Sequence, residues 1–183
     1  MTDLLRWDLE ERLEDAVVQY LNTSALQSTS IKVFPAFSTA IIEYPCAVVH
    51  CGRSQKLVES GEFTVHRQLD VEVAVMTEAS NQMDALGLVT LTARQRNADA
   101  RNAVINALGV MDDNPPPGIS SLCSPEDVPV GLAAWLDIQK IDGIWVSHAH
   151  IGEITRSLDT DKKCLVSTIS IGVIAQPVKI GGY

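Results

Sequence analysis

The sequence predicts an α+β domain, with a mainly antiparallel sheet and with an N-terminal helix and a long central helix packed on one face. Three patterns support this. Apolar residues recur at every fourth position over 3–22, apolar and polar residues alternate over 65–76, and residues 163–176 are β-branched and almost uncharged. The third pattern is typical of a strand covered on both faces. With 183 residues, 46% of them hydrophobic, residues 1–183 can form one domain with a real core.

Residues 3–22 are predicted to form an amphipathic helix. Its apolar stripe consists of Leu5, Leu9, Leu13, Val17 and Leu21, widened by Ala16 and Tyr20. The opposite side, expected to be a solvated acidic face, carries Glu10, Glu11, Glu14 and Asp15. Trp7 lies off the apolar stripe. A tryptophan in that position on a surface helix is a candidate subunit contact, and wrapping over the edge of the core is the alternative.

The next segments are predicted to build the first part of the sheet. Residues 31–34 form a short strand that ends at Pro35, and residues 46–51 form a second strand. Polar residues over 54–66 indicate an extended hairpin arm. Residues 65–76 then form a half-buried strand, whose apolar face consists of Val65, Leu69, Val71, Val73 and Val75.

The second half of the chain begins with a long helix over 81–108, or two helices in sequence, stopped by Gly109. The proline- and glycine-rich residues 111–131 are predicted to be a loop, and we interpret this loop as an excursion toward a partner. Strands are then expected over 134–140 and 144–156, before the last strand and a short tail over 176–183.

The acidic charge balance argues against a protein that binds nucleic acid through a broad basic surface. The chain has 14 basic and 23 acidic residues, a net charge of −9, which argues against a broad phosphate-gripping surface. An acidic wall would instead let DNA slide past without sticking. No stretch approaches the roughly 18 apolar residues of a membrane span. The acidic N-terminus does not resemble a secretory signal, so we expect a cytoplasmic protein with reduced, mostly buried cysteines.

Two patterns were considered as reactive centres. His148 and His150 lie on the same face of a predicted strand, and this spacing can chelate a metal ion if a third ligand joins them. Two partly exposed strand histidines are the alternative. Cys51 adjoins His50, but neighbours on a strand project to opposite faces and so make a poor catalytic dyad. We therefore predict no catalytic residue, no cofactor and no enzyme activity.

The order of these elements resembles the tail terminator proteins of tailed bacteriophages, also called tail completion or minor tail proteins. The matching features are the N-terminal helix, the short strand IKVFP and the aromatic–proline entry Tyr44-Pro45 into the second strand. A polar hairpin, the strand RQLDVEV, the long helix over 81–108 and a final strand pair ending in VSTISIGVIA follow. The resemblance is one of pattern and spans most of the chain.

The resemblance implies a ring, usually of six copies, that caps the head-proximal end of the tail tube. Such a homohexamer stops tube polymerisation, contacts the tail tube protein and joins a neck or connector protein. Genomic DNA passes through its lumen without specific binding. It also implies a virion protein, assembled in the bacterial host cytoplasm with no membrane partner. A head-tail connector or another ring protein of the neck or tail is one alternative, and a small metal-dependent enzyme that uses His148 and His150 is another.

Ring closure needs contacts between different patches of neighbouring copies. The hairpin arm, the loop over 111–131 and the tail are natural elements for such contacts. From these segments and the first helix we expect an interface that includes Trp7, Arg53, Lys56, Glu59, Glu62, Arg67, Pro116, Pro117, Lys179 and Tyr183. Acidic side chains expected to line the pore are Glu10, Glu14, Asp112 and Asp113.

Overall fold

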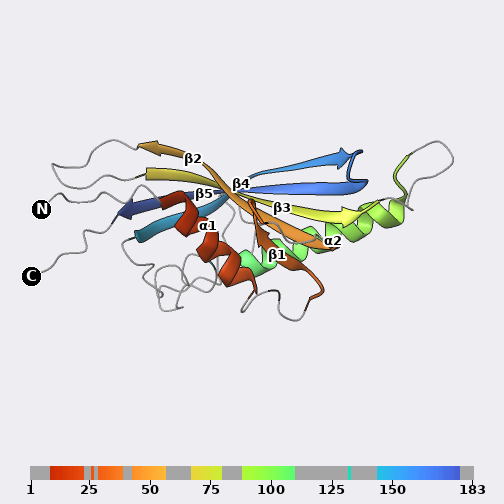
Figure 1. Cartoon of the computed structure of the whole chain (residues 1–183), viewed down its shortest axis with the longest axis horizontal. Helices are drawn as coiled ribbons and strands as arrows, with labels where there is room; N and C mark the ends of the chain where they lie inside the picture. The colour runs from red at the N-terminus through yellow and green to blue at the C-terminus, as the bar shows by residue number, and fades with distance from the viewer. Residues whose placement is uncertain are drawn as a thin grey trace, which may run out of the picture.

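A computed structural model describes residues 9–22, 26, 29–38, 43–56, 67–79, 88–109, 132 and 144–177. Within these residues the chain forms two helices and five strands, which confirms the predicted α+β class (Figure 1). The elements are, in chain order, α1 (Leu9–Tyr20), β1 (Lys32–Pro35), β2 (Cys46–Lys56), β3 (Arg67–Glu78), α2 (Leu91–Leu108), β4 (Ile144–Asp159) and β5 (Cys164–Pro177).

The five strands form one twisted sheet in the order β1-β2-β3-β5-β4. β1 pairs with β2 in parallel, and the other three pairings are antiparallel. β1 and β4 are therefore the two edges of the sheet (Figure 1). Among the described residues, the short β1 pairs with only residues 46–49 of β2, whereas β4 is a long edge interrupted by two register shifts.

Both helices cover the same face of the sheet. α1 packs on β1 and β2, and α2 packs on β3 and β5. The predicted apolar stripe of α1 is confirmed where it is described, because Leu13, Val17 and Leu21 are fully buried. They meet a row of fully buried residues from the central strands: Val49, Leu69, Val71, Val73, Val75, Ile169, Ile171 and Val173. Burial of each such side chain contributes about 1.5–3 kcal/mol to folding.

The opposite face of the sheet is half-exposed. On β5, Ser167, Ile169 and Ile171 face the helices and are fully buried, whereas Thr168 and Ser170, which point the other way, are only partly covered. On β5 the helix side is therefore well covered and the other side partly covered, where Gly172 is buried and no described residue is exposed. The physical reason for the difference is that both described helices pack on the same side, so residues of the other side are less completely covered.

The described residues exclude one unbroken helix over 81–108, whereas the predicted alternative, a separate first helix over 81–87, lies outside them. Residues 88–90 are not helical, and α2 begins at Leu91 with Thr90 as its N-cap, whose hydroxyl accepts a hydrogen bond from the Ala93 N–H at 3.3 Å. The predicted stop is confirmed. Gly109 adopts a left-handed conformation with φ 56° and donates its N–H to the Ile105 carbonyl.

Several predicted segments lie outside the described residues. They are 3–8 of the first helix, 57–66 of the hairpin arm, 81–87 of the long helix, the loop over 111–131, the strand over 134–140 and the tail after 177. Leu132, just past the predicted loop, is described and fully buried in the core. Within the described residues, no helix is both long enough and apolar enough to span a bilayer.

Candidate functional site

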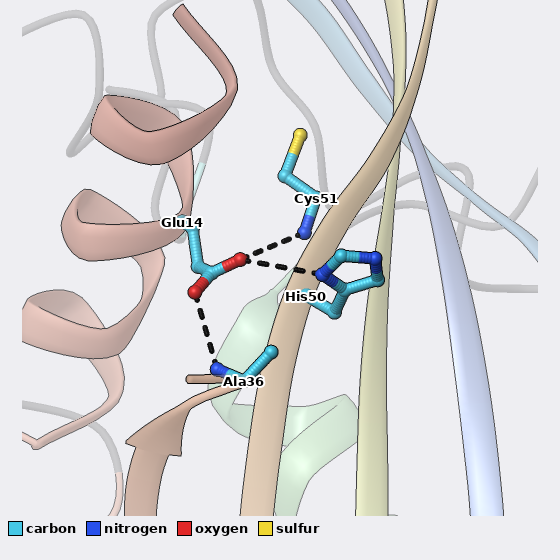
Figure 2. A network of polar contacts seen from close by, with 4 residues as sticks. All are labelled: Glu14, Ala36, His50 and Cys51. Carbon is cyan, nitrogen blue, oxygen red and sulfur yellow. Dashed lines mark hydrogen bonds and ion pairs between the residues drawn. The ribbon is translucent and has the colours of Figure 1, made fainter. Parts of the chain in front are cut away.

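A buried carboxylate joins α1 to the first two strands (Figure 2). Glu14 is only 8% exposed, and its two oxygens accept hydrogen bonds from the backbone N–H groups of Ala36 and Cys51, each at 3.1 Å. β1 pairs with β2 only up to Val49, so the N–H of Cys51 lies beyond the last paired residue of β1. Glu14 thus satisfies backbone donors that the short edge strand leaves without a partner.

The prediction of a solvated acidic face is wrong for Glu14. It lies three residues before Val17 and seven before Leu21, which places it on the buried side of the helix. A carboxylate held inside the subunit in this way does not line a pore. Glu10 is half-buried, and Glu11 and Asp15 are exposed as predicted. The sequence signal for the buried acid is its helical spacing from apolar residues, which the acidic composition of the segment obscured.

His50 lies beside this carboxylate. Its Nδ1 is 3.5 Å from Glu14 Oε2, a separation at which the two groups form an ion pair only when the imidazole is protonated. The ring also folds back over Gly52, where a Cβ atom would lie 2.8 Å from His50 Nε2. Gly52 stands at the register shift between Cys51 and Arg53, so a side chain there would displace the imidazole.

The cluster of Glu14, His50 and Cys51 contains the residue types of a nucleophilic site, but its geometry does not support that chemistry. Figure 2 shows the Cys51 thiol directed away from the His50 ring. Burial, followed by the negative charges of Glu10 and Glu14, raises the pKa of the Cys51 thiol to about 12. At neutral pH the sulfur keeps its proton and is a poor nucleophile. The cluster is a structural link between α1 and the sheet.

The other described thiols behave in the same way. Cys46, Cys51 and Cys164 are buried and free of disulfide bonds, as predicted, and Cys123 lies outside the described residues. Burial raises the pKa of Cys46 to about 11 and also raises the pKa of Cys164. None of the three is an accessible, activated thiol.

A second polar network lies under α2. Asn97 donates to the Thr77 hydroxyl at 3.1 Å and to the Leu165 carbonyl at 3.2 Å, and it accepts a hydrogen bond from the Ser167 hydroxyl. Asn97 and Thr77 are buried, and Ser167 is fully buried. This network fixes α2 on β3 and β5. The sequence analysis missed it, because Asn97 falls in the most polar part of the predicted helix.

The structure brings few of the predicted interface and pore residues together. The backbones of Lys56 and Arg67 pair directly at one end of β2 and β3, close to Arg53, so these three predicted interface positions share the base of the hairpin arm. Glu10 and Glu14 lie on α1. The other predicted interface and pore residues fall outside the described residues: Trp7, Glu59, Glu62, Pro116, Pro117, Lys179, Tyr183, Asp112 and Asp113.

The two histidines considered for metal binding lie on the edge strand β4. Their backbones pair with Ile174 and Gly172 of β5, and both fall between the two register shifts. Among the described side chains, which do not include these two, no group of three or more histidines, cysteines or acids is arranged to hold a metal ion.

Comparisons with known proteins show a likeness of fold but no matching family. No protein-family model matches the sequence, and no curated protein matches it. Among solved structures, the chain is similar to a chain in the virion of a native gene transfer agent (GTA) particle. The sequences are 13% identical, the match covers 90% of this chain and 94% of the other, and the TM-score is 0.50. The likeness shows a shared fold over nearly the whole length of both chains.

Proposed function

We propose that this protein is a structural component of a phage-like virion, and that within this class it is a tail terminator. In this role six copies form a ring on the head-proximal end of the tail tube. The ring stops tube polymerisation and presents a surface to the neck or connector protein. Its partners are the tube protein on one side and the neck on the other, and the genome passes through the lumen.

The observation that carries this proposal is the fold shared with a virion chain. The match leaves little of either protein uncovered, so the two chains agree in the whole arrangement of their elements rather than in one common motif. The order of elements in the sequence independently resembles tail terminators. Fold alone does not fix function, so the site chemistry must agree as well.

The described chemistry is compatible with a structural role. The buried thiols keep their protons, and the buried carboxylate of Glu14 accepts two backbone hydrogen bonds. The polar side chains of Asn97, Thr77 and Ser167 are used to fix a helix on the sheet. These groups hold the fold together, which is what a protein needs when its function is to present surfaces to other subunits.

The acidic balance of the chain supports passage of DNA. With a net charge of −9, a lumen lined by this protein repels the phosphate backbone of DNA. DNA therefore does not bind the lumen in the salt-dependent way in which it binds a basic channel. Glu10, which is half-buried on α1, remains a proposed lumen residue together with Asp112 and Asp113. Glu14 does not belong to this set, because it is enclosed between α1 and the sheet.

Deletion of the gene tests the terminator role. Without a terminator nothing stops the addition of tube subunits, so electron microscopy of a deletion lysate should show headless tails that are longer than wild-type tails and vary in length. A plasmid copy of the wild-type gene should restore the length and the heads. Headless tails of normal length would contradict the terminator role and point to the connector alternative instead.

A further inference from the structure

We infer a specific contact between copies, in which Phe37 of one copy enters a groove between α2 and the β4–β5 hairpin of the next. The inference rests on the proposed function, because it assumes that copies of the chain assemble with one another. Beyond the proposed function, the inference names the two surfaces that meet and says which surface each copy contributes to its neighbour.

The groove lies at the free edge of the sheet. It has a volume of about 440 Å³ and is lined by Leu88, Val89, Arg94, Asn97, Arg156, Ser157, Leu158, Leu165 and Val166. Its described lining is therefore apolar in the main, carries two arginines and includes no acid. A cavity of about 150 Å³ lined by apolar side chains is large enough to bind benzene. The groove can thus accept a phenyl ring together with its flanking backbone.

The groove exists because the helices cover only part of their face of the sheet. α2 packs on β3 and β5, which leaves the helix-side residues of the edge strand β4 poorly covered. Ile154 is 41% exposed and Leu158 is 37% exposed. Near the start of α2, Leu88 and Leu91 are 55% and 81% exposed. An apolar strip of this kind at one edge is typical of a surface that another protein covers.

Phe37 is the matching projection. It is 87% exposed, more than any other large apolar side chain among the described residues. Its position is nevertheless fixed, because the neighbouring Ala36 N–H is bonded to Glu14 and the Ser38 N–H is bonded to the Pro35 carbonyl. The ring also meets His50 edge-on, with the centroids 6.1 Å apart. A rigid, exposed aromatic residue is the usual anchor of a protein interface.

The groove carries positive charge, whereas α1, to which Glu14 connects the residue before Phe37, has an acidic exposed side. Arg94 and Arg156 are exposed at the groove, and within the described part of the chain neither guanidinium forms an ion pair. Phe37 projects beside α1, whose exposed side carries Glu11 and Asp15 one turn apart. In a chain of net charge −9, a groove whose described lining has two arginines and no acid favours an acidic occupant.

The two surfaces belong to opposite edges of the sheet. Strands β1 and β4 are the two edges of the sheet (Figure 1). Phe37 follows β1 in the chain, and Arg156, Ser157 and Leu158 of β4 line the groove. A contact between two different patches is heterologous, so each copy gives one projection and receives one. Repetition of such a contact closes a ring when the rotation between copies divides a full turn.

Photocrosslinking from position 37 tests this contact in the assembled protein. p-Benzoylphenylalanine replaces Phe37, and irradiated oligomers or particles are digested and analysed by mass spectrometry. Crosslinks between copies should fall on residues 88–94 and 156–166. Crosslinks to other surfaces of the neighbouring copy would overturn the inference but leave the proposed function intact. Absence of the chain from both oligomers and particles would overturn both.

A mixing experiment tests the direction of the contact. Phe37→Ala removes the projecting phenyl ring. The double variant Arg94→Glu and Arg156→Glu reverses the charge of the groove. Each change should weaken self-association by about thirtyfold, as expected for interface anchors. Arg96→Glu, an exposed residue of the same helix outside the groove, is the matched control and should leave association unchanged. All these side chains are exposed, so folding should be unaffected.

The two defective variants each keep one intact surface. When mixed, they should form heterodimers detectable by native mass spectrometry, joined through the phenylalanine of one and the groove of the other. A contact that uses the same patch on both copies would give no such heterodimer. If wild-type chains associate but the mixed variants form no heterodimer, the inference is overturned.

Discussion

At the scale of single residues, the Glu14 carboxylate accepts hydrogen bonds from backbone N–H groups that lie beyond the end of the short strand β1. These are the N–H groups of Ala36 and Cys51, and the two bonds hold α1 against β1 and β2. Hydrogen bonds to an ionised acceptor are roughly twice as strong as neutral ones, and unsatisfied buried donors are costly. One side chain therefore supports both the packing of α1 and the position of the chain at Phe37.

Replacement of Glu14 by alanine should lower the free energy of unfolding by about 1–3 kcal/mol, because two backbone donors lose their acceptor. Urea unfolding monitored by circular dichroism measures the change. Glu11→Ala, on the exposed side of the same helix, is the control and should change stability by less than about 0.5 kcal/mol. Equal stability of the two variants would contradict the structural role assigned to Glu14.

The buried thiols predict a loss of stability at alkaline pH. The pKa values of Cys46 and Cys51 are raised by burial to about 11 and about 12, whereas an unfolded thiol titrates near about 8.5. Above that pH the folded state holds protons that the unfolded state has lost. The stabilisation is complete below about pH 8.5 and is lost as the pH rises toward these folded pKa values, by about 1.4 kcal/mol per pH unit for each thiol.

Comparison of the wild-type chain with the double variant Cys46→Ala and Cys51→Ala checks this effect. The variant should be less stable at about pH 8, because two buried sulfurs are removed, but its stability should fall less steeply between about pH 9 and about pH 10. Equal slopes for the two proteins would show that the thiols do not titrate differently in the folded and unfolded chains.

The residue scale is where prediction from sequence was weakest. The exposure of Glu11 and Asp15 and the burial of Leu13 follow from helical periodicity. The burial of Glu14 does not follow from charge, since it depends on where β1 ends and which backbone groups remain unpaired. The role of Phe37 is equally invisible in the sequence, because its exposure is set by the turn after Pro35.

At the scale of elements, α2 is held by polar contacts as well as apolar ones. Val104 and Leu108 enter the core, while Asn97 connects the helix to Thr77 of β3 and Ser167 of β5. A satisfied buried network fixes one orientation of a helix on a sheet more sharply than apolar packing does. The position of α2 in turn sets the width of the groove beside β4.

Asn97→Ala should lower the free energy of unfolding by about 2–3 kcal/mol, since it leaves the Ser167 hydroxyl and the Leu165 carbonyl without their partner. Chemical denaturation provides the measurement. Asn102→Ala, at an exposed position of the same helix, should have little effect and serves as the control. A similar loss in both variants would indicate a general helix effect rather than loss of the network.

Helices and strands were predicted well where one spacing of apolar residues dominates the sequence. The alternation around Leu69 to Val75 identified β3, and Gly109 identified the end of α2. The interruption at 88–90 was not located from sequence, because apolar Leu88 and Val89 give no sign of a helix boundary there, and the Thr90 cap sets the start of α2. Pairing partners and sheet edges, which create the groove, depend on tertiary arrangement and carry no local signal.

At the scale of the whole molecule, the proposed ring combines a rigid sheet with an acidic surface. Reversal of the charge in Glu10→Lys should slow genome release by creating a point of attraction for phosphate, without preventing assembly. The delay should shrink as salt is raised, because screening weakens the attraction. Release kinetics measured by dye binding to ejected DNA test this, with Glu10→Gln as the neutral control. Unchanged kinetics in both variants would remove Glu10 from the lumen.

Cryo-electron microscopy of intact particles tests the central proposal most directly. Density for this chain should form one closed ring, expected to contain six copies, between the last layer of the tail tube and the neck, with DNA or an open channel at its centre. Placement of the chain along the whole tube, in the capsid shell or outside the particle would contradict the terminator role.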